Sequence, residues 1–305
     1  MKTALITGVD GQDGAYLALF LLQKGYTVYG GFHRPDHWRL DKLGITEDVR
    51  LVPCELLEPS GFRRLLDQTS PDEIYNLAAL SFVGTSFTNP VTVAEVNGVA
   101  VGRFLSEITP DTRFYQASTS EMFGNEPAPQ SEETRFRPRS PYGVAKLYAH
   151  ELCRNYRERG HQVSAGILFN HESCLRGREF VTQKIATAFR ERKRIRLGNM
   201  EARRDWGHAW DYVRAMWMML QAEPDEYVVG TGETHSVAEF WHACDSYMPG
   251  SWPAIDETLF RPTEVNELCA DYNKIHKALG WKPEISFDEL VEEMLAGKPV
   301  VSATA

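Results

Sequence analysis

The sequence has little cysteine, and its cysteines form neither a metal-binding nor a disulfide pattern. They are odd in number, widely spaced and without a Cys-x-x-Cys pair: Cys54, Cys153, Cys174, Cys244 and Cys269. This distribution argues against a disulfide framework and against a zinc site. We therefore expect no bound metal and a reducing, cytoplasmic compartment.

Long apolar runs, internal repeats and low-complexity tracts are also lacking. No run approaches the ~20 residues of a membrane helix, and we expect no signal peptide ahead of the first apolar segment. The formal net charge of -9 argues against nucleic acid as a partner. One basic run, FRERKRIRLG at 189–198, departs from this average. It is interpreted as a solvated helix end or as a pocket for a doubly charged ligand.

Strand-like and helix-like segments alternate along the first 170 residues. We expect strands at 4–6, 26–32, 49–54, 72–79, 112–119 and 163–170, and helices at 14–23, 60–69, 91–108 and 140–159. This alternation predicts an α/β fold with a Rossmann-type, doubly wound parallel sheet. Later the pattern loosens, with helices expected at 211–221 and 288–296. We expect a cofactor domain at 1–170, with later strand and helix contributions, and a smaller substrate domain mainly at 171–305.

Three glycines lie between the first expected strand and the first expected helix. Gly8, Gly11 and Gly14 have the spacing Gly-x-x-Gly-x-x-Gly, which differs from the commoner Gly-x-Gly-x-x-Gly. Glycine at such a turn allows a close approach of the backbone to a dinucleotide pyrophosphate, which the helix N-terminus then stabilises. A plain structural turn is the alternative interpretation.

The end of the second expected strand bears on which dinucleotide binds. An NAD enzyme usually has Asp or Glu here for the ribose 2′-hydroxyl, whereas Arg suits a 2′-phosphate. The sequence is GGFHRPDHWR, with Arg34 and Arg39 close to the strand end and no acid in place. We therefore predict NADP, with Arg34 as the phosphate ligand or, alternatively, as a solvated surface charge.

Tyr142 and Lys146 lie four residues apart in the helix expected at 140–159, so their side chains share one face. An ammonium group one turn away favours the phenolate and lowers the pKa of a tyrosine. Such a tyrosine can take a proton from a hydroxyl while hydride leaves the same carbon. The same spacing also occurs by chance in many helices.

The stretch QASTSEMFG ends an expected strand, where functional residues gather in this architecture. Ser118, Thr119 and Ser120 offer hydroxyls to a substrate oxygen, although Ser and Thr also commonly cap helices and turns. Glu121 is more informative, because plain alcohol oxidation needs no carboxylate. It suggests a second proton transfer, such as abstraction next to a carbonyl.

Seven stretches together resemble the GDP-mannose 4,6-dehydratases, a family of extended short-chain dehydrogenases/reductases. They are TGVDGQDGAYLA, YNLAALSFVGTSF, FYQASTSEMFG, PRSPYGVAKLYAH, GILFNHES, FVTQKI and RRDWGHAWDYVRAMWMMLQ. RPTEVNELCADYNKIHKALGWKP is similar to the family's C-terminal segment. The resemblance implies an internal redox cycle in which NADP⁺ takes hydride from C4 of the hexose, water leaves across C5–C6, and the hydride returns to C6.

The resemblance also implies roles for individual residues. Tyr142 is then the base at the C4 hydroxyl, supported by Lys146, while Thr119 bonds that hydroxyl. Glu121 removes the C5 proton and helps protonate the leaving 6-hydroxyl. The implied cofactor residues are Gly8, Gly11, Gln12, Asp13, Gly14, Arg34, Glu55, Leu56, Leu77, Ala78, Ala79, Ser81, Tyr142, Lys146, His171 and Arg176. The implied GDP-sugar residues are Ser81, Ser120, Asn170, Lys184, Asn199, Arg204, Arg261 and Glu264.

The sequence departs from the family pattern at several positions. Glu55 stands where Asp is usual, and Leu80, Gln183 and Cys174 replace the usual Gln, Arg and Pro. The loop RPDHWR is shorter than the family's Arg-Arg-Ser loop, which reaches a neighbouring subunit's cofactor. The resemblance implies a homo-oligomer, and the shorter loop leaves a homodimer and a homotetramer open.

Three alternatives to a GDP-mannose dehydratase remain open. The segment between His235 and Arg261, at the edge of the sugar site, is compact, so a GDP-manno-heptose is the first alternative, as the substrate. A sugar-nucleotide reductase or epimerase is the second, although Glu121 argues against it. A non-enzymatic NADP-binding module is the third, and the four catalytic candidates argue against that.

Overall fold

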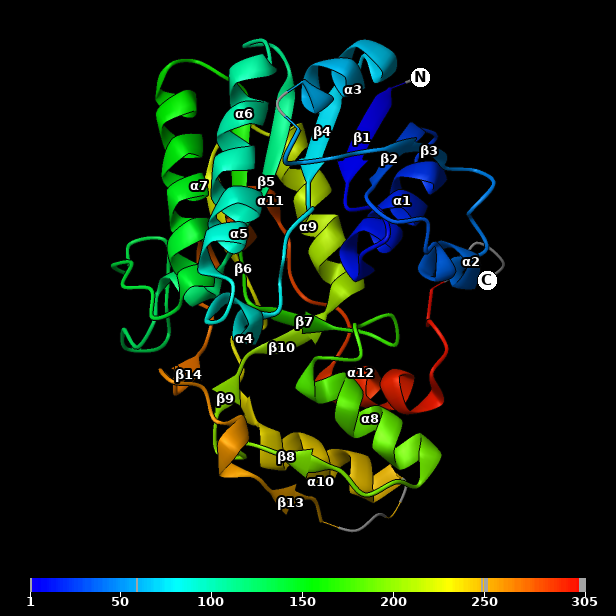
Figure 1. The fold of residues 1–305 in the computed structure, drawn as a ribbon, viewed down its shortest axis with the longest axis vertical. Coiled ribbons are helices and arrows are strands. Elements are labelled where there is room, and N and C mark those ends of the chain that lie inside the picture. The colour runs from blue at the N-terminus through cyan, green and yellow to red at the C-terminus, as the bar shows by residue number, and fades with distance from the viewer. Residues whose placement is uncertain (1, 59, 248, 250–251, 302–305) are drawn as a thin grey trace.

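The computed structural model describes residues 2–58, 60–247, 249 and 252–301. A seven-stranded parallel sheet forms its centre (Figure 1), with the strand order β11-β6-β5-β4-β1-β2-β3. The strands are β1 (Thr3–Thr7), β2 (Thr27–Phe32), β3 (Arg50–Pro53), β4 (Glu73–Asn76), β5 (Arg113–Thr119), β6 (Val163–Leu168) and β11 (Glu226–Val229). The predicted Rossmann-type sheet is confirmed.

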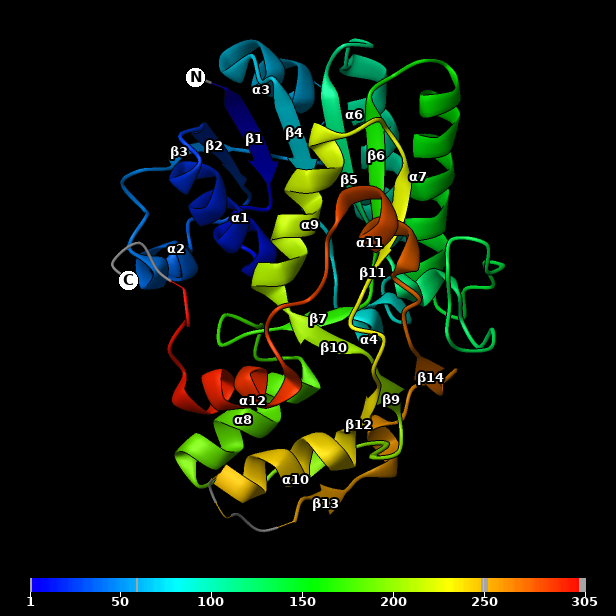
Figure 2. The ribbon, with the colours of Figure 1, turned by 180° about the vertical axis from the view of Figure 1, so that it is seen from behind.

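Helices cover both faces of this sheet (Figures 1 and 2). One face packs on α1 (Gln12–Gln23), α2 (Trp38–Leu43), α9 (Ala209–Gln221) and α11 (Asn273–Leu279). The other packs on α3 (Gly61–Thr69), α6 (Ala100–Glu107) and α7 (Pro141–Glu158). Successive side chains of a strand point to opposite faces. In β1, Ala4 and Ile6 therefore enter the first core and Leu5 the second, which explains why this strand is apolar throughout.

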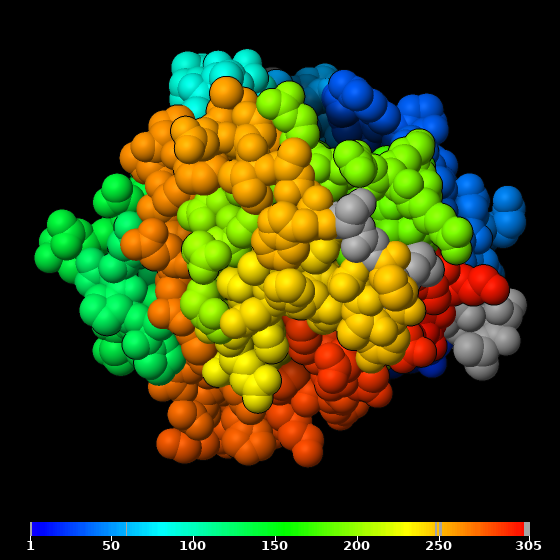
Figure 3. Space-filling view, turned by 90° about the horizontal axis from the view of Figure 1, so that it is seen from below, coloured from blue at the N-terminus to red at the C-terminus, as the bar shows by residue number. Residues whose placement is uncertain are grey.

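A smaller layer lies below the carboxyl ends of the strands (Figure 2). Its helices α8 (Val181–Glu191), α10 (Val237–Tyr247) and α12 (Phe287–Ala296) share a core of their own. Its short strands are β7 (Asn170–Glu172), β8 (Arg196–Leu197), β9 (Arg203–Arg204), β10 (Trp206–His208), β12 (His235–Ser236), β13 (Ala254–Ile255) and β14 (Glu267–Leu268). Seen from below, the light green, yellow, orange and red segments that follow residue 170 cover this end (Figure 3).

The chain crosses between the two layers more than once. Both α9 and β11 come after residue 170 and yet belong to the central sheet layer. The sheet layer is therefore built from both early and late parts of the chain. The division of the chain into domains at residue 170 stays a prediction.

Several elements differ from the sequence-based expectation. The single helix expected at 91–108 is α5 (Pro90–Ala94), a π-helical turn η1 (Glu95–Val99) and α6 in succession. Helices α2, α8, α10 and α11 and the short helix α4 (Val83–Ser86) were not expected. Two 3-10 turns, η2 (Ser120–Met122) and η3 (Glu257–Leu259), complete the described elements. Three of the missed helices, α2, α4 and α11, have seven residues or fewer, which is too short to show a clear apolar period.

Candidate active site

One cavity of about 550 Å³ lies at the carboxyl ends of the strands. In an open α/β sheet, ligands bind in the crevice where the strand order reverses. Here β1 lies between β4 and β2, so the reversal falls at the glycine turn that follows β1. The ends of β2 to β6 and the start of α7 complete the walls.

The glycine turn after β1 fits a dinucleotide. Gly8 has a positive φ of 72°, and a Cβ added there would lie 2.8 Å from the Cα of Ala78. A Cβ added to Gly14 would lie 2.2 Å from the carbonyl oxygen of Gly8, which is backbone and cannot move aside. Within the described residues, no side chain caps α1, whose N-cap is Gly11. Its first N–H groups therefore face the cavity as an anion-binding end.

Most of the predicted cofactor residues line this cavity. They are Gly8, Gly11, Gln12, Asp13, Gly14, Glu55, Leu56, Leu77, Ala78, Ala79, Ser81, Tyr142, Lys146, His171 and Arg176. Arg34 is the exception, because it lies exposed beside His33, which does line the wall. Arg39 is also unsuited to a phosphate, since its guanidinium donates to the backbone carbonyls of Asp10 and Leu175, each at 2.7 Å.

Asp13 and His171 form an ion pair across the cavity floor. His171 Nε2 lies 2.8 Å from Asp13 Oδ2, and His171 Nδ1 lies 2.7 Å from the carbonyl oxygen of Phe169. Burial acts to raise the pKa of Asp13, but the charge and hydrogen bond of His171 outweigh it and the net pKa is lowered. Burial acts to lower the pKa of His171, but the charge and hydrogen bond of Asp13 outweigh burial, so the net pKa is raised.

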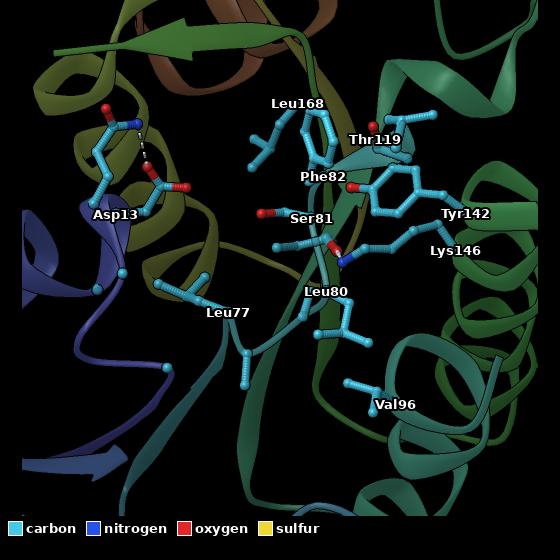
Figure 4. A pocket seen from close by; sticks show the side chains of 18 of the residues that line it. Asp13, Leu77, Leu80, Ser81, Phe82, Val96, Thr119, Tyr142, Lys146 and Leu168 are labelled. Atoms are coloured by element: carbon cyan, nitrogen blue, oxygen red, sulfur yellow. Dashed lines mark hydrogen bonds between the residues drawn. The ribbon is translucent and has the colours of Figure 1, made fainter. Parts of the chain in front are cut away.

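The catalytic candidates converge from β5 and α7. Figure 4 shows Tyr142 and Lys146 extending from α7 into the cavity, with Thr119 beside the phenol and Asp13 on the opposite side. Lys146 Nζ donates to the carbonyl oxygen of Ala117 at 3.0 Å. Ser140 caps α7 by accepting from the N–H of Gly143, and Pro141 follows at the helix start.

Burial controls both titratable groups of this pair. It raises the pKa of Tyr142 to about 12, although the Thr119 hydrogen bond acts in the other direction. It lowers the pKa of Lys146 to about 8. The net pKa of Tyr142 is therefore above its ordinary value in the protein alone, because loss of solvation outweighs the groups that act to lower it.

Glu121 lies in the same cavity with an arginine beside it. Its carboxylate is mostly buried, and Arg261 Nη1 lies 3.4 Å from Oε1. Arg261 also lines the cavity, and its backbone N–H donates to Glu264 at 3.1 Å. Ser120 and Asn170 line the wall nearby.

Arg204 is buried behind this group, at 7 % exposure. Its guanidinium donates a hydrogen bond to the carbonyl oxygen of Arg203, at 2.8 Å. Within the described part of the chain, no carboxylate lies at ion-pair distance, and burial lowers its pKa. An uncompensated buried guanidinium is costly, so this position favours an anion.

Arg204 and three other substrate candidates do not line the cavity. Lys184 is exposed on α8, Glu264 is half-buried, and Asn199 accepts a hydrogen bond from the N–H of Glu201. The basic run at 189–198 ends α8 and leads into β8, and it lines no described pocket. Within the described residues, no cluster of three metal-ligating side chains is present.

Sequence reasoning missed several wall residues. They are His33, Leu57, Phe82, Val83, Thr92, Val96, Ala117, Leu168, Phe169 and Phe180. Most are apolar and carry no chemical signal of their own. Four of them, His33, Ala117, Leu168 and Phe169, lie near the end of a strand of the sheet, and this position is the signal that they share.

The fold and the site together define an extended short-chain dehydrogenase/reductase. A UDP-glucose 4-epimerase from Thermotoga maritima has the same fold, with a TM-score of 0.90, 20% identity, and coverage of 97% of this chain and 98% of that chain. A dTDP-glucose 4,6-dehydratase from Bacillus anthracis gives a TM-score of 0.87 at 18% identity, covering 97% and 96%.

Sequence comparison defines the family more closely. The family model for GDP-mannose 4,6 dehydratase matches residues 5–294. GDP-mannose 4,6 dehydratase 1 of Arabidopsis thaliana is 45% identical, over 96% of this chain and 89% of that protein. The human GDP-mannose 4,6 dehydratase is 41% identical, over 96% and 90%. The chain belongs to the GDP-mannose 4,6-dehydratase family, and the resemblance seen in the sequence is confirmed.

Proposed function

We propose that this protein converts GDP-mannose to GDP-4-keto-6-deoxymannose, as a lyase that uses a nicotinamide dinucleotide without net consumption. Family membership supports the reaction. The observation that carries it is the placement of the Glu121 carboxylate in one cavity with Tyr142, Lys146 and Thr119. Oxidation of C4 to a ketone requires a base such as Tyr142 supported by Lys146, and the elimination that follows requires a separate carboxylate such as Glu121.

The cofactor that we propose is NADP, held by the glycine turn, Asp13, His171 and Arg176. When bound, its nicotinamide accepts the hydride from C4 and later gives it to C6. Arg34 is exposed at the end of β2, which leaves its guanidinium able to reach a 2′-phosphate. Selection of NADP over NAD rests on this arginine alone.

Tyr142 takes the proton of the C4 hydroxyl, and Thr119 orients that hydroxyl. Because burial disfavours the phenolate, the positive charge of Lys146 is needed to make the proton transfer feasible. Glu121 then removes the C5 proton, which the new C4 ketone acidifies, and protonates the departing 6-hydroxyl as water. After the hydride has reached C6, Glu121 takes up a second proton and transfers it to C5. Tyr142 then releases the proton that it took from the C4 hydroxyl.

The substrate diphosphate is assigned to Arg204 and Arg261. Arg204 is a buried cation without a carboxylate partner among the described residues, and a diphosphate supplies the missing charge. Asn170, Ser81 and Ser120 are proposed to contact the sugar. Lys184, Asn199 and Glu264 stay predictions for the nucleotide end.

We also propose a homodimer in the cytoplasm. A second, apolar hollow lies between α5 and α7, lined in part by Val99, Val144 and Tyr148. Val144 is 56% exposed and Tyr148 51%, so much apolar surface lies uncovered on one face. Among the described residues, no helix is long and apolar enough to cross a membrane.

The test is incubation of the purified protein with GDP-mannose and trace oxidised cofactor, followed by mass spectrometry. We expect loss of one water from the sugar nucleotide without accumulation of reduced cofactor. Steady consumption of reduced cofactor would instead indicate a reductase. Turnover of GDP-manno-heptose but not of GDP-mannose would reassign the substrate.

A further inference from the structure

His150 is buried behind the site and yet bonds to one of its walls. It lies one helical turn beyond Lys146 on α7 and is 0 % exposed. Its Nδ1 atom lies 2.9 Å from the hydroxyl oxygen of Ser118. Ser118 lines the cavity and directly precedes Thr119 on β5. A side chain outside the reaction is therefore hydrogen-bonded to the strand that carries the reactive hydroxyl.

The other ring nitrogen of His150 faces an anion. Nε2 lies 3.4 Å from Oε2 of Glu226 on β11, which is long for a hydrogen bond. Arg154 Nε and Arg157 Nη2, from the following turns of α7, each donate to Glu226 at 2.8 Å. Burial acts to raise the pKa of Glu226, but these bonds outweigh it and hold that pKa far below its ordinary value.

The anion determines which nitrogen of His150 carries a proton. A proton on Nε2 faces Glu226 favourably, so in the neutral ring Nδ1 is the acceptor and the Ser118 hydroxyl is the donor. The Ser118 bond is the shorter of the two contacts and is the one with hydrogen-bond geometry. Ser118 on β5 is therefore bonded to His150 on α7. Helix α7 is in turn bonded to β11 through Glu226.

Two consecutive residues of β5 thus bond to two successive turns of α7. The pairs are Ala117 with Lys146 and Ser118 with His150. Tyr142, Lys146 and His150 are spaced by four and so share one face of the helix. The first pair contains a proposed reactive group, and the second pair adds a further bond between the strand end and the same helix face.

We propose that His150 is a positioning residue that acts through Ser118 to fix the register between the end of β5 and the Tyr142–Lys146 face of α7. This inference rests on the proposed function. A shift of about 1 Å between reacting groups costs roughly 10²-fold in rate. Loss of the Ser118–His150 bond should therefore lower kcat and leave KM, which reports substrate binding, nearly unchanged.

Two substitutions of His150 separate its two contacts. In His150→Asn the amide lies where Nδ1 was, so the Ser118 bond is kept and the Glu226 contact is lost. In His150→Gln the amide reaches the Nε2 position, so the Glu226 contact is kept and the Ser118 bond is lost. We expect His150→Asn to keep most of its kcat and His150→Gln to lose about 10- to 100-fold.

Ser118→Ala is the matched variant on the strand and should lose kcat as His150→Gln does. The double variant Ser118→Ala/His150→Gln should be no slower than either single variant, because both remove one bond. Urea unfolding of each variant separates this effect from stability, since Asn and Gln at position 150 should destabilise to a similar extent.

Equal kcat losses for the Asn and Gln variants, or additive losses in the double variant, would overturn the positioning role. Such results would leave His150 as a purely structural residue. Wild-type protein that turns over no GDP-linked sugar would instead overturn the proposed function, and this inference with it.

Discussion

Lys146 Nζ lies 6.0 Å from the centre of the Tyr142 ring and donates its hydrogen bond to the backbone of Ala117. The ammonium is thus held near the phenol, but it is bound to the end of β5. The distance suits an electrostatic role for Lys146 better than a direct proton transfer. It also means that the position of β5 determines where the charge sits.

Lys146→Met is expected to abolish most activity and to stabilise the fold at pH 7. Burial lowers the pKa of Lys146 to about 8, so at pH 7 the folded state holds a buried ammonium at a cost. A depressed lysine pKa means that the unfolded chain binds more protons between pH 8 and the ordinary value of 10.5. Wild-type stability therefore rises with pH across that window.

Urea unfolding of both proteins at several pH values measures this difference. At pH 7 we expect the variant to be more stable by about 1–3 kcal/mol, with the difference narrowing above pH 8. A Lys146→Met protein that is less stable than wild type at pH 7 would contradict the assignment of burial as the main effect.

Glu121→Gln is expected to separate oxidation from elimination. An amide cannot take the C5 proton, so water loss should fall by about 10²- to 10⁴-fold. The C4 oxidation relies on Tyr142 and should continue. Reduced cofactor should then accumulate up to one equivalent per active site, as followed by its absorbance, whereas wild type accumulates none. Water loss at the wild-type rate in the variant would exclude Glu121 as the base.

Arg204→Met is expected to weaken substrate binding without harming the fold. The guanidinium is buried and donates to a backbone carbonyl, so an apolar side chain of similar length removes a buried charge that has no carboxylate partner among the described residues. We expect KM for GDP-mannose to rise about 10- to 100-fold, the loss of one or two charge-assisted hydrogen bonds, and the melting temperature to stay level or rise. Arg203→Met, at a partly exposed residue paired with Glu239, is the control and should leave KM unchanged.

Val144→Asp is expected to convert a dimer to a monomer. Val144 is 56% exposed on α7 beside the apolar hollow, and a carboxylate buried in a dimer interface is strongly unfavourable. Light scattering coupled to gel filtration measures the mass. Ile255→Asp is the control, because Ile255 is 49% exposed on β13 in the other layer. A wild-type monomer, or dissociation by both substitutions, would contradict the proposed interface.

The sequence alone determined the alternation of strands and helices along the first 170 residues, the glycine turn and the candidate residues Thr119, Glu121, Tyr142 and Lys146. These features depend on neighbours in the chain, because apolar periodicity, glycine spacing and a four-residue helical repeat are local properties.

Only the tertiary structure decided which charges meet. It placed Arg261 beside Glu121, left Arg204 buried without a carboxylate among the described residues, and linked His150 to Ser118 and Glu226. These partners lie tens of residues apart in the chain, so no local pattern relates them. Burial, which raises the Tyr142 pKa and lowers that of Lys146, likewise arises only when the sheet and its helices pack together.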